Sequence, residues 1–369
     1  MHINSLSLRN FRNYSELDFA PSQGLNIIIG ENAQGKTNLI ESIFLCGFGR
    51  SHRTTDDSDM VQYKKGGAAV LLKVSDRYDN TQSISVKLYP SQPKQIFIDG
   101  MRPHRLGELM GCLHVVLFSP ESLQLVKGSP SERRRFLDMG ISQLGRAYFY
   151  KLQQYNTALR QRNALLKSPE MLKDPAHLDM WDSVLAKSGA YIASARKRYV
   201  ERIRPYIFEI YSSLCDDKEI FSVEYISGIA CNSDSADELE EAFLSRLHES
   251  RDDDIRRGYT GLGAHKDDLT FKTNAQDTKS FASQGQQRSA ALAMKLSEIS
   301  LIESISGEKP VVLLDDVFSE LDESRCDALL RSVEDCQCFI TCAKESLAEM
   351  INADFTLFHC EEGHIEQIS

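Results

Sequence analysis

Apolar and polar residues alternate over the first part of the chain, which predicts two paired β-strands at 2–11 and 14–20. A continuous apolar run at 25–29 follows, and such a run is typical of a strand buried on both faces. It ends at Gly30, and residues 37–47 then have the spacing of an amphipathic helix. We therefore expect a buried strand, a glycine-containing turn and a helix in direct succession.

A different pattern begins at Ser131, a candidate helix N-cap. Apolar residues between 137 and 159 recur at steps of three and four residues, which predicts a helix with coiled-coil-like spacing. Two prolines interrupt this pattern within 167–175, and a second helical run follows over 181–203, with Pro205 as its kink or end. Two such runs joined by a short turn predict an antiparallel helical hairpin.

The remaining apolar runs predict strands within 66–116 and at 219–228, 310–316 and 336–341, and helices at 235–250 and near 322–334. Sheet-forming residues thus lie on both sides of the helical hairpin. We predict an α/β fold with mixed β-sheets and an inserted antiparallel α-helical domain. The expected segments are 1–118 and 216–369 for the sheet-containing part and 119–215 for the insertion.

The composition is that of an ordinary globular protein, with 41% hydrophobic and 26% charged residues among 369. A net charge of −10 argues against a protein that coats nucleic acid through its overall charge, but it leaves a local basic face open. We see no secretory signal and no run approaching the roughly 18 apolar residues of a membrane span, so we expect a cytoplasmic protein. Its nine cysteines, an odd number spread through a long chain without a signal, are expected as buried or free thiols. Cys336, Cys338 and Cys342 are expected to alternate along a strand or its exit, because the C-x-x-C spacing and histidine partners of a zinc site are absent there.

The turn after the first buried strand matches the phosphate-binding pattern G-x-x-x-x-G-K-[ST]. It consists of Gly30, Glu31, Asn32, Ala33, Gln34, Gly35, Lys36 and Thr37. Its glycines permit backbone angles at which several N–H groups point inward, and the following helix N-terminus attracts anions. Lys36 is expected to reach the β- and γ-phosphates of ATP, and Thr37 to hold Mg²⁺.

Two aspartates, Asp315 and Asp316, follow four apolar residues of a predicted buried strand. Open α/β sheets bind their ligands at the carboxyl ends of such strands. We expect Asp315 to bind Mg²⁺, directly or through water, and Asp316 to polarise the water that attacks the γ-phosphate.

A second anion-binding helix end is predicted at 281–296, where a small polar turn precedes a strong helix. Gly285 allows close approach of the backbone, and Ser283 can donate a hydrogen bond to a phosphate oxygen. Since the chain already has one phosphate loop, this second end is best explained as serving the nucleotide of another molecule. It therefore predicts a dimer.

Together these motifs resemble the SMC-like family of ABC-type P-loop ATPase heads, and most closely the RecF group of bacterial recombination mediators. The blocks that carry the resemblance span nearly the whole chain: 8–14, 30–43, 118–138, 161–167, 263–269, 283–298 and 313–322. The resemblance implies that ATP contacts extend to Asn38, Arg12 and Asn13. It also implies a loosely assigned Q-loop position at Glu121.

The resemblance further implies a signature motif that caps the γ-phosphate of ATP held by a second subunit; its residues are Ser283, Gln284, Gly285, Gln286 and Gln287. A D-loop, with Ser319 and Asp322, would cross the same interface. The family's usual catalytic glutamate and switch histidine correspond here to Asp316 and to Thr341 or Cys342. The shorter acid and the missing imidazole imply slow ATP hydrolysis, as in a timing device.

Clusters of cations on the predicted helical hairpin are candidates for contacts with DNA phosphates; they are Arg133, Arg134, Arg135, Arg160, Arg162, Arg196, Lys197 and Arg198. No sequence signature supports the reading of bases. In the block 263–269 the family's usual arginine is Lys266, which would offer a point charge rather than a fork.

The resemblance implies an ATP-controlled clamp on duplex or gapped DNA in recombinational repair, replication restart and the SOS response. It would help load RecA at single-strand gaps, together with RecO and RecR, in the nucleoid. Two alternatives stay open. A transporter ATPase would dock 119–215 on a membrane partner, and a nuclease related to overcoming-lysogenization proteins would need a separate acidic metal domain.

Overall fold

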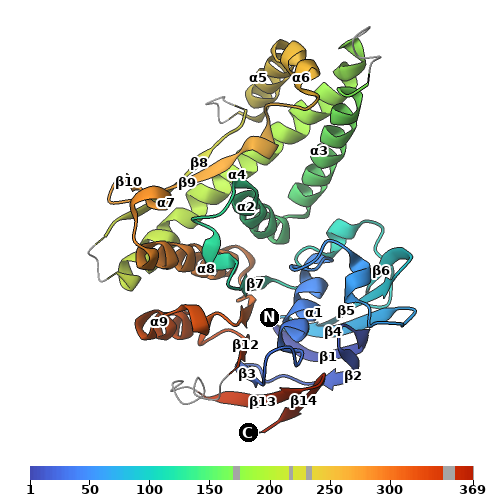
Figure 1. Ribbon diagram of the computed structural model, residues 1–369, viewed down its shortest axis with the longest axis vertical. Coiled ribbons are helices and arrows are strands. Elements are labelled where there is room, and N and C mark those ends of the chain that lie inside the picture. The colour runs from blue at the N-terminus through green and yellow to red at the C-terminus, as the bar shows by residue number, and fades with distance from the viewer. Residues whose placement is uncertain (169–174, 216–218, 230–234, 344–353, 369) are drawn as a thin grey trace. The chain divides into compact units, whose positions relative to one another are not determined.

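The computed structural model describes residues 1–168, 175–215, 219–229, 235–343 and 354–368, and forms two compact units (Figure 1). The first unit contains 1–124, 209–218 and 283–369, and the second contains 125–208 and 219–282. This division differs from the expected segments, because 219–282 belongs with the helical unit. No helix among the described residues is both long and apolar enough to cross a membrane.

A six-stranded sheet forms the centre of the first unit, in the order β14-β13-β3-β12-β11-β7. Its strands are β3 (Leu25–Ile29), β7 (Val115–Phe118), β11 (Val311–Asp315), β12 (Cys338–Cys342), β13 (Phe355–Glu361) and β14 (His364–Gln367). All pairs are parallel except β13 with β14. Every residue of β3, β7, β11 and β12 is buried, which is why these strands are continuously apolar in the sequence.

A five-stranded antiparallel sheet also belongs to this unit, in the order β2-β1-β4-β5-β6. Its strands are β1 (His2–Phe11), β2 (Tyr14–Phe19), β4 (Ala68–Ser75), β5 (Thr81–Tyr89) and β6 (Gln92–Ile98). Burial alternates along β4 and β5, as expected for a sheet with one packed face. The predicted pairing of the first two strands is confirmed.

Among its described residues, the first unit has three α-helices: α1 (Lys36–Phe48), α8 (Gln284–Ser306) and α9 (Glu323–Val333). Short 3₁₀ turns occur at η1 (Asp57–Met60), η2 (Leu106–Leu109), η3 (Ser122–Gln124) and η7 (Phe318–Glu320). Helix α1 contacts strands of both sheets, so it is buried on nearly all sides. It begins directly after the glycine-containing turn, as the sequence predicts.

The second unit contains the helices α2 (Pro130–Leu144), α3 (Arg146–Leu165), α4 (Asp179–Leu214), α5 (Ala236–Glu249), α6 (Arg251–Arg257) and α7 (Thr278–Phe281). The last residues of α4 belong to the first unit. The second unit also contains the antiparallel sheet β10-β9-β8, formed by β8 (Phe221–Ile226), β9 (Asp268–Thr273) and β10 (Gln276–Asp277), and the 3₁₀ turns η5 (Pro175–Leu178) and η6 (Ala264–Lys266). The predicted helical insertion is thus confirmed, and the strands β8, β9 and β10, which follow it in the sequence, belong to the same unit.

Helix boundaries in the second unit differ from the prediction at three places. The first helical run is divided at Gly145, and its N-cap is Ser129 rather than Ser131, with Pro130 at the first helical position and Glu132 completing a capping box. Helix α4 continues through Pro205 to Leu214. Pro205 is exposed, so the carbonyl that loses its helical hydrogen bond there can be solvated.

Candidate nucleotide site

The turn between β3 and α1 has the backbone shape of a phosphate loop. Gly30, Ala33 and Gly35 all have positive φ angles, of 152°, 68° and 126°. A Cβ atom on Gly30 would lie 2.2 Å from the carbonyl oxygen of Cys360, and one on Gly35 would lie 2.8 Å from Asn13 Nδ2. Both positions therefore require glycine for space as well as for conformation.

Neighbouring segments hold this loop in place through its carbonyl groups. Asn13 Nδ2 and the backbone N–H of Gly363 both donate to the Gln34 carbonyl oxygen, at 2.7 and 3.0 Å. The Tyr14 hydroxyl donates to the Gly35 carbonyl oxygen at 3.0 Å. These contacts shape the loop without using the N–H groups that a phosphate would need. The expected role of Asn13 near the nucleotide is thus that of a loop support, and sequence reasoning missed Tyr14 and Gly363.

Lys36 is buried and lies against the same loop. Its Nζ donates to the carbonyl oxygens of Gly30 and Glu31, at 2.6 and 2.7 Å. Glu31, Asn32 and Ala33 are exposed, so the outer part of the loop is accessible. The ammonium group is therefore placed within the loop, where a phosphate would meet it.

The first acid of the expected pair joins three elements at the carboxyl edge of the parallel sheet. Asp315 Oδ1 accepts hydrogen bonds from Thr37 Oγ1 on α1, at 3.0 Å, and from Thr341 Oγ1 on β12, at 2.8 Å. Burial raises the pKa of the Asp315 carboxyl above its usual range, and the two hydroxyl groups only partly oppose this effect. A buried carboxylate beside a threonine hydroxyl supplies the oxygen ligands that Mg²⁺ prefers, so Thr37 and Asp315 fit the expected metal.

The second acid is exposed next to this position. Asp316 has a φ of 52°, and its backbone N–H donates to Thr341 Oγ1 at 3.1 Å. Its carbonyl oxygen accepts a hydrogen bond from the Ser319 hydroxyl at 2.9 Å. A non-glycine residue in this region costs energy unless the surroundings hold it, and such positions are frequent at functional sites. Thr341, the expected switch residue, contacts both acids.

A group of charged residues close to α1 was only partly predicted. Arg12 Nε and Nη2 donate to the two carboxylate oxygens of buried Glu41, at 2.8 and 2.7 Å. Its described contacts are thus with α1 and the Asp59 carbonyl oxygen, and not with the loop itself. Arg53, which the sequence analysis did not single out, donates to Asn38 Oδ1 at 2.9 Å and lies 3.6 Å from Glu41.

Arg53 also links the expected Q-loop position to this site. Burial opposes ionisation of Glu121, but a hydrogen bond with Ser119 and the nearby charges of His52 and Arg53 hold its pKa below the usual range. The charge of Arg53 also lowers the pKa of the Asp315 carboxyl, against the larger effect of burial. A basic residue whose charge acts on two acids of the expected site is a candidate nucleotide contact. The sequence analysis missed it, although the run 49–54 contains two arginines and a histidine that could have indicated it.

The second anion-binding helix end is formed by the start of α8. Ser283 is its N-cap: the side-chain oxygen accepts from Gln286 N–H at 3.2 Å, and Gln286 Oε1 accepts from Ser283 N–H at 2.7 Å. Because the hydroxyl accepts in this capping box, its hydrogen stays available to donate. Ser283 and Gln284 are exposed and Gln287 is buried. In the expected D-loop, Ser319 contacts Asp316 and Asp322 is the N-cap of α9.

Three of the eight expected DNA-contacting cations are buried in ion pairs, which corrects the prediction for them. Arg133 pairs with Asp268 at 2.6 Å, Arg162 with Asp182 and Asp254 at 2.5 and 2.7 Å, and Arg196 with Asp138 and Asp267, both at 2.7 Å. Their exposures are 5%, 0% and 2%. These arginines hold the second unit together and have no surface for a phosphate.

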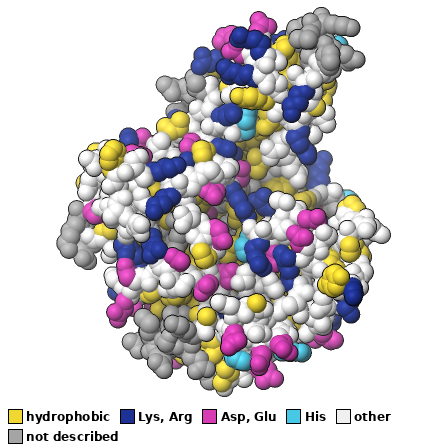
Figure 2. Space-filling view, in the orientation of Figure 1, with side chains coloured by type: hydrophobic (Ala, Val, Ile, Leu, Met, Phe, Trp, Pro, Cys, Tyr) yellow, Lys and Arg dark blue, Asp and Glu magenta, His cyan; other side chains and the backbone are white. Residues whose placement is uncertain are grey.

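The other five cations retain some surface. Arg135, Arg160 and Arg198 are exposed, whereas Arg134 and Lys197 are partly buried. Figure 2 shows Lys and Arg side chains mixed with Asp and Glu over the face in view, in agreement with the acidic net charge.

The block 263–269 forms the centre of the second unit. Asp267 accepts hydrogen bonds from Arg196, from Gly228 N–H and from the Tyr225 hydroxyl, the first two at 2.7 Å. Lys266 is exposed, with its Nζ 5.5 Å from the centre of the Tyr259 ring. The block thus acts structurally through its aspartates, and Lys266 is left as its exposed cation.

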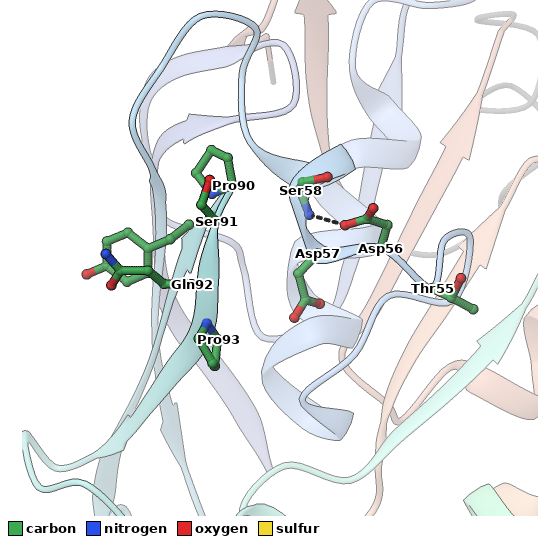
Figure 3. Close-up of a pocket in the computed structure, with 9 residues that line it drawn as sticks. Thr55, Asp56, Asp57, Ser58, Pro90, Ser91, Gln92 and Pro93 are labelled. Atoms are coloured by element: carbon green, nitrogen blue, oxygen red, sulfur yellow. Dashed lines mark hydrogen bonds between the residues drawn. The ribbon is translucent and has the colours of Figure 1, made fainter. Parts of the chain in front are cut away.

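Two further features lie outside the expected site. A polar pocket of about 560 Å³ between η1 and the β5–β6 turn is lined by residues that include Asp56, Tyr89 and Pro93 (Figure 3). None of the expected site residues lines it. Among the described residues, Asp179, Asp182 and His248 are close enough to share a metal, but Arg251 pairs with both carboxylates, so this cluster is already neutralised.

Comparison with known sequences covers the whole chain. The model of the family described as RecF/RecN/SMC N terminal domain matches residues 2–366. The DNA replication and repair protein RecF of Clostridium acetobutylicum is 39% identical over 368 residues, with all of both chains covered. The protein of the same name from Clostridium tetani is 39% identical over 365 residues, covering 98% of this chain and 99% of the relative.

Solved structures agree with these matches. A structure described as the recombination mediator protein RecF-ATP in the RecFOR pathway has a TM-score of 0.92 and 33% identity, covering 100% of this chain and 98% of the other. A structure of an Smc head bound to the C-winged helix domain of ScpA has a TM-score of 0.57 and 17% identity, covering 100% and 97%. The second likeness concerns the fold alone. With the RecF structure, it shows that the mixed α/β architecture is that of an SMC/RecF-type head with a helical insertion.

Proposed function

The chain belongs to the RecF family of DNA replication and repair proteins, within the RecF/RecN/SMC N-terminal domain family, and on that premise we propose that it is an ATP-dependent dimerising DNA-binding protein. ATP binding would bring two copies together, the dimer would hold duplex DNA at a single-strand gap, and slow hydrolysis would release it. Its role would be to help load RecA recombinase, together with RecO and RecR, during recombinational repair and replication restart.

One observation carries this proposal. The first unit contains a turn with the backbone angles expected of a phosphate loop, with Asp315 in contact with Thr37, and it also contains a second exposed, capped helix end that could bind an anion. A single nucleotide site requires one such loop. The presence of two anion-binding helix ends in one unit is explained if each copy binds its own ATP through its loop and contacts the ATP of its partner through the second helix end.

The roles of the residues follow from their contacts. The backbone N–H groups of 30–37 and the Lys36 ammonium would bind phosphate oxygens, while Thr37 and Asp315 would hold Mg²⁺, which neutralises phosphate charge when bound. Asp316 would orient the attacking water through its exposed carboxylate. Ser283 would donate to the γ-phosphate of the partner copy. With an aspartate in place of glutamate and no histidine at Thr341, we expect a weak Mg-dependent ATPase used as a switch.

The decisive experiment is sedimentation velocity with ATP, with ADP and without nucleotide, each with and without gapped DNA. We expect a dimer with ATP alone, and its loss in Lys36→Met and Ser283→Arg. Exposed positions on β4 and in the β5–β6 turn provide matched controls, Lys73→Met and Ser91→Arg, which should dimerise as the wild type does. An ATP-induced dimer that survives both site variants would contradict the proposal.

The alternatives receive less support. A transporter ATPase would fractionate with membranes through its helical unit, and the RecF relatives give no support for this. A nuclease would cut DNA with Mg²⁺ or Mn²⁺, but the acidic cluster near Asp182 in the described part of the chain is paired with arginines. Membrane co-fractionation or strand scission would reopen the respective alternative.

A further inference from the structure

A single arginine at the start of α9 contacts the start of α8. Arg325 Nη2 donates to the Gly285 carbonyl oxygen at 3.1 Å, and Arg325 Nε donates to Ser289 Oγ at 2.9 Å. Its Nη1 donates to the carboxylate of Asp322, the N-cap of its own helix. The side chain is 19% exposed, so this three-way contact is largely withdrawn from solvent. Arg325 therefore connects Asp322, the last residue of the expected D-loop, with the first turns of α8, which carry the expected signature motif.

A second contact joins the same two segments. Arg288 Nη2 lies 2.8 Å from Glu320 Oε2, with both side chains 43% exposed. An exposed pair of this kind contributes about 0–1 kcal/mol by itself. Together with the contacts of Arg325, however, this pair joins the segment 320–325 to the segment 285–289 at two places.

The tied segment begins at the acid pair. The Ser319 hydroxyl donates to the Asp316 carbonyl oxygen at 2.9 Å, and Glu320 follows directly. A continuous series of contacts thus runs from Asp316, beside the nucleotide of one copy, to Gly285 in the signature turn. Under the proposed function, that turn faces the nucleotide of the other copy.

The chemistry of position 325 fits this link better than a simple structural contact. The guanidinium presents several donors in a fixed plane, so that it can satisfy a carbonyl, a hydroxyl and a carboxylate together. A Cβ on Gly285 would lie 3.2 Å from Arg325 Nη2, so a larger residue at 285 would press on the guanidinium. The glycine of the signature motif thus provides room for the arginine as well as for a phosphate.

We propose that Arg325 is a positioning residue: it sets the signature turn 283–288 of its own copy for the ATP of the partner copy, and links that turn to the D-loop 319–322. The inference rests on the proposed function. Because a displacement of about 1 Å can cost a hundredfold in rate, we expect Arg325→Ala to lower kcat by roughly tenfold to a hundredfold. ATP binding to the monomer, through its own phosphate loop, should be unchanged.

The matched controls keep folding effects apart from positioning. Arg331→Ala removes an exposed arginine from the same helix and should hydrolyse ATP at the wild-type rate. Arg325→Lys retains the charge but not the fork, so an intermediate rate is expected. The charge exchange of Arg288→Glu with Glu320→Arg should restore part of the activity that each single variant loses. If Arg325 had only a structural role, the loss of kcat in Arg325→Ala would be accompanied by a lower melting temperature, and Arg325→Lys would recover both together.

Mixed dimers test the direction of the effect. Under the proposed function, each ATP site of a dimer combines the phosphate loop and Asp316 of one copy with the signature turn of the other copy. We consider a dimer of one Asp316→Asn copy and one Arg325→Ala copy. If Arg325 acts on the partner's nucleotide, both substitutions affect the same ATP site. The other site is then intact, so an equimolar mixture should recover about a quarter of wild-type activity, from half of the dimers with one of two sites working. A mixture of Asp316→Asn with Ser283→Ala is the control for a signature that acts on the partner's ATP.

Each outcome decides between the claims. Recovery in both mixtures supports the inference. Recovery with Ser283→Ala but not with Arg325→Ala overturns the inference and leaves the proposed function standing, as does wild-type kcat in Arg325→Ala. No recovery in either mixture, or no ATP-dependent dimer of the wild type, overturns the proposed function and the inference with it.

Discussion

At the scale of single residues, Gly30 occupies a position that no side chain fits. Its φ is 152°, and a Cβ would lie 2.2 Å from the Cys360 carbonyl oxygen, on the neighbouring strand β13. We predict that Gly30→Ala lowers the free energy of unfolding by roughly 3 kcal/mol and removes ATP binding. Chemical denaturation and titration calorimetry with ATP would measure the two effects.

The control for this substitution is Gly24→Ala. A Cβ at position 24 has no atom within 4 Å, and Gly24 is not among the residues with positive φ. The control should bind ATP as the wild type does. Unchanged ATP affinity in Gly30→Ala would show that 30–37 is not a nucleotide loop.

Asp315 carries an energetic cost that a bound cation would offset. Burial raises its pKa, so the folded state holds the proton more tightly than the unfolded chain. Stability is therefore lost as the pH rises from the ordinary pKa of 3.8 through the raised pKa of the folded state. Asp315→Asn retains an oxygen for the Thr37 and Thr341 hydroxyls and removes the charge. We predict a melting temperature a few degrees higher without nucleotide, and loss of Mg²⁺-dependent ATP hydrolysis.

Asp316→Asn provides the comparison, because this neighbouring acid is exposed. It should abolish hydrolysis without raising the melting temperature. Differential scanning fluorimetry between pH 4 and pH 8 would measure both variants. A melting temperature of Asp315→Asn that falls below that of the wild type at pH 7 would mean that the carboxylate is stabilising.

At the scale of elements, local patterns were sufficient wherever an element is buried on all sides or follows a fixed motif. Apart from Asn26, the runs at 25–29 and 311–314 are apolar because both faces of these strands are covered, and the residues after each run lie at the carboxyl edge of the sheet. The phosphate loop, the acid pair and the capped start of α8 all followed from such short-range signals.

Contacts between distant segments were not predictable in this way. Gly363 and Cys360 support the loop from more than 300 residues away, and nothing in their local sequence indicates it. The same holds for Arg162 and Arg196, which look like solvated helix cations by spacing but pair with Asp254 and Asp267 of a later segment. Those pairs are also the reason why 219–282 belongs with the helices.

The turn η6 supplies a prediction about the second unit. His265 Nδ1 lies 2.7 Å from the Tyr155 hydroxyl and Nε2 lies 3.0 Å from the Thr260 carbonyl oxygen, so the neutral ring accepts at Nδ1 and donates at Nε2. Burial lowers the pKa of His265 from 6.5 to about 4, and nearby Lys266 and Arg134 add to this. The unfolded chain then binds more protons between these values, so stability falls as the pH decreases from 6.5 to 4.

We predict that His265→Gln removes up to roughly 3 kcal/mol of this pH dependence, since its amide can still donate to the Thr260 carbonyl. Urea unfolding at pH 7.5 and pH 4.5, followed by the single tryptophan Trp181 of α4, would measure it. His364→Gln, an exposed site on β14, is the matched control and should keep the wild-type pH dependence. Equal behaviour of the two variants would contradict the assigned burial of His265.

At the scale of the whole molecule, the distribution of charge limits how DNA can be held. The chain has a net charge of −10, and three of the arginines that the sequence offered for DNA are consumed by internal ion pairs. Under the proposed function, DNA would then be held by the exposed cations that remain, and dimerisation would double their number. ATP would control DNA affinity through the dimer, because two weak copies joined together bind far more tightly than one.

Arg160 and Arg198 are exposed cations on α3 and α4 and allow this limit to be tested. Each arginine that contacts a phosphate contributes about 0.9 to the slope of log K against log salt concentration. We predict that Arg160→Gln with Arg198→Gln lowers the magnitude of this slope by about 1.8 per copy and leaves the melting temperature unchanged. Arg162→Ala should instead cost 3–5 kcal/mol of stability, since it removes the ion-pair partner of buried Asp254 and one of the two arginines that pair with buried Asp182. Fluorescence anisotropy of gapped DNA across a salt series, with ATP present, would measure the slopes.

The control variant combines Lys73→Gln with Arg102→Gln, two exposed positions in the first unit. A slope that changes in the control pair and not in the α3–α4 pair would transfer the DNA contact from the helical unit to the unit that binds the nucleotide.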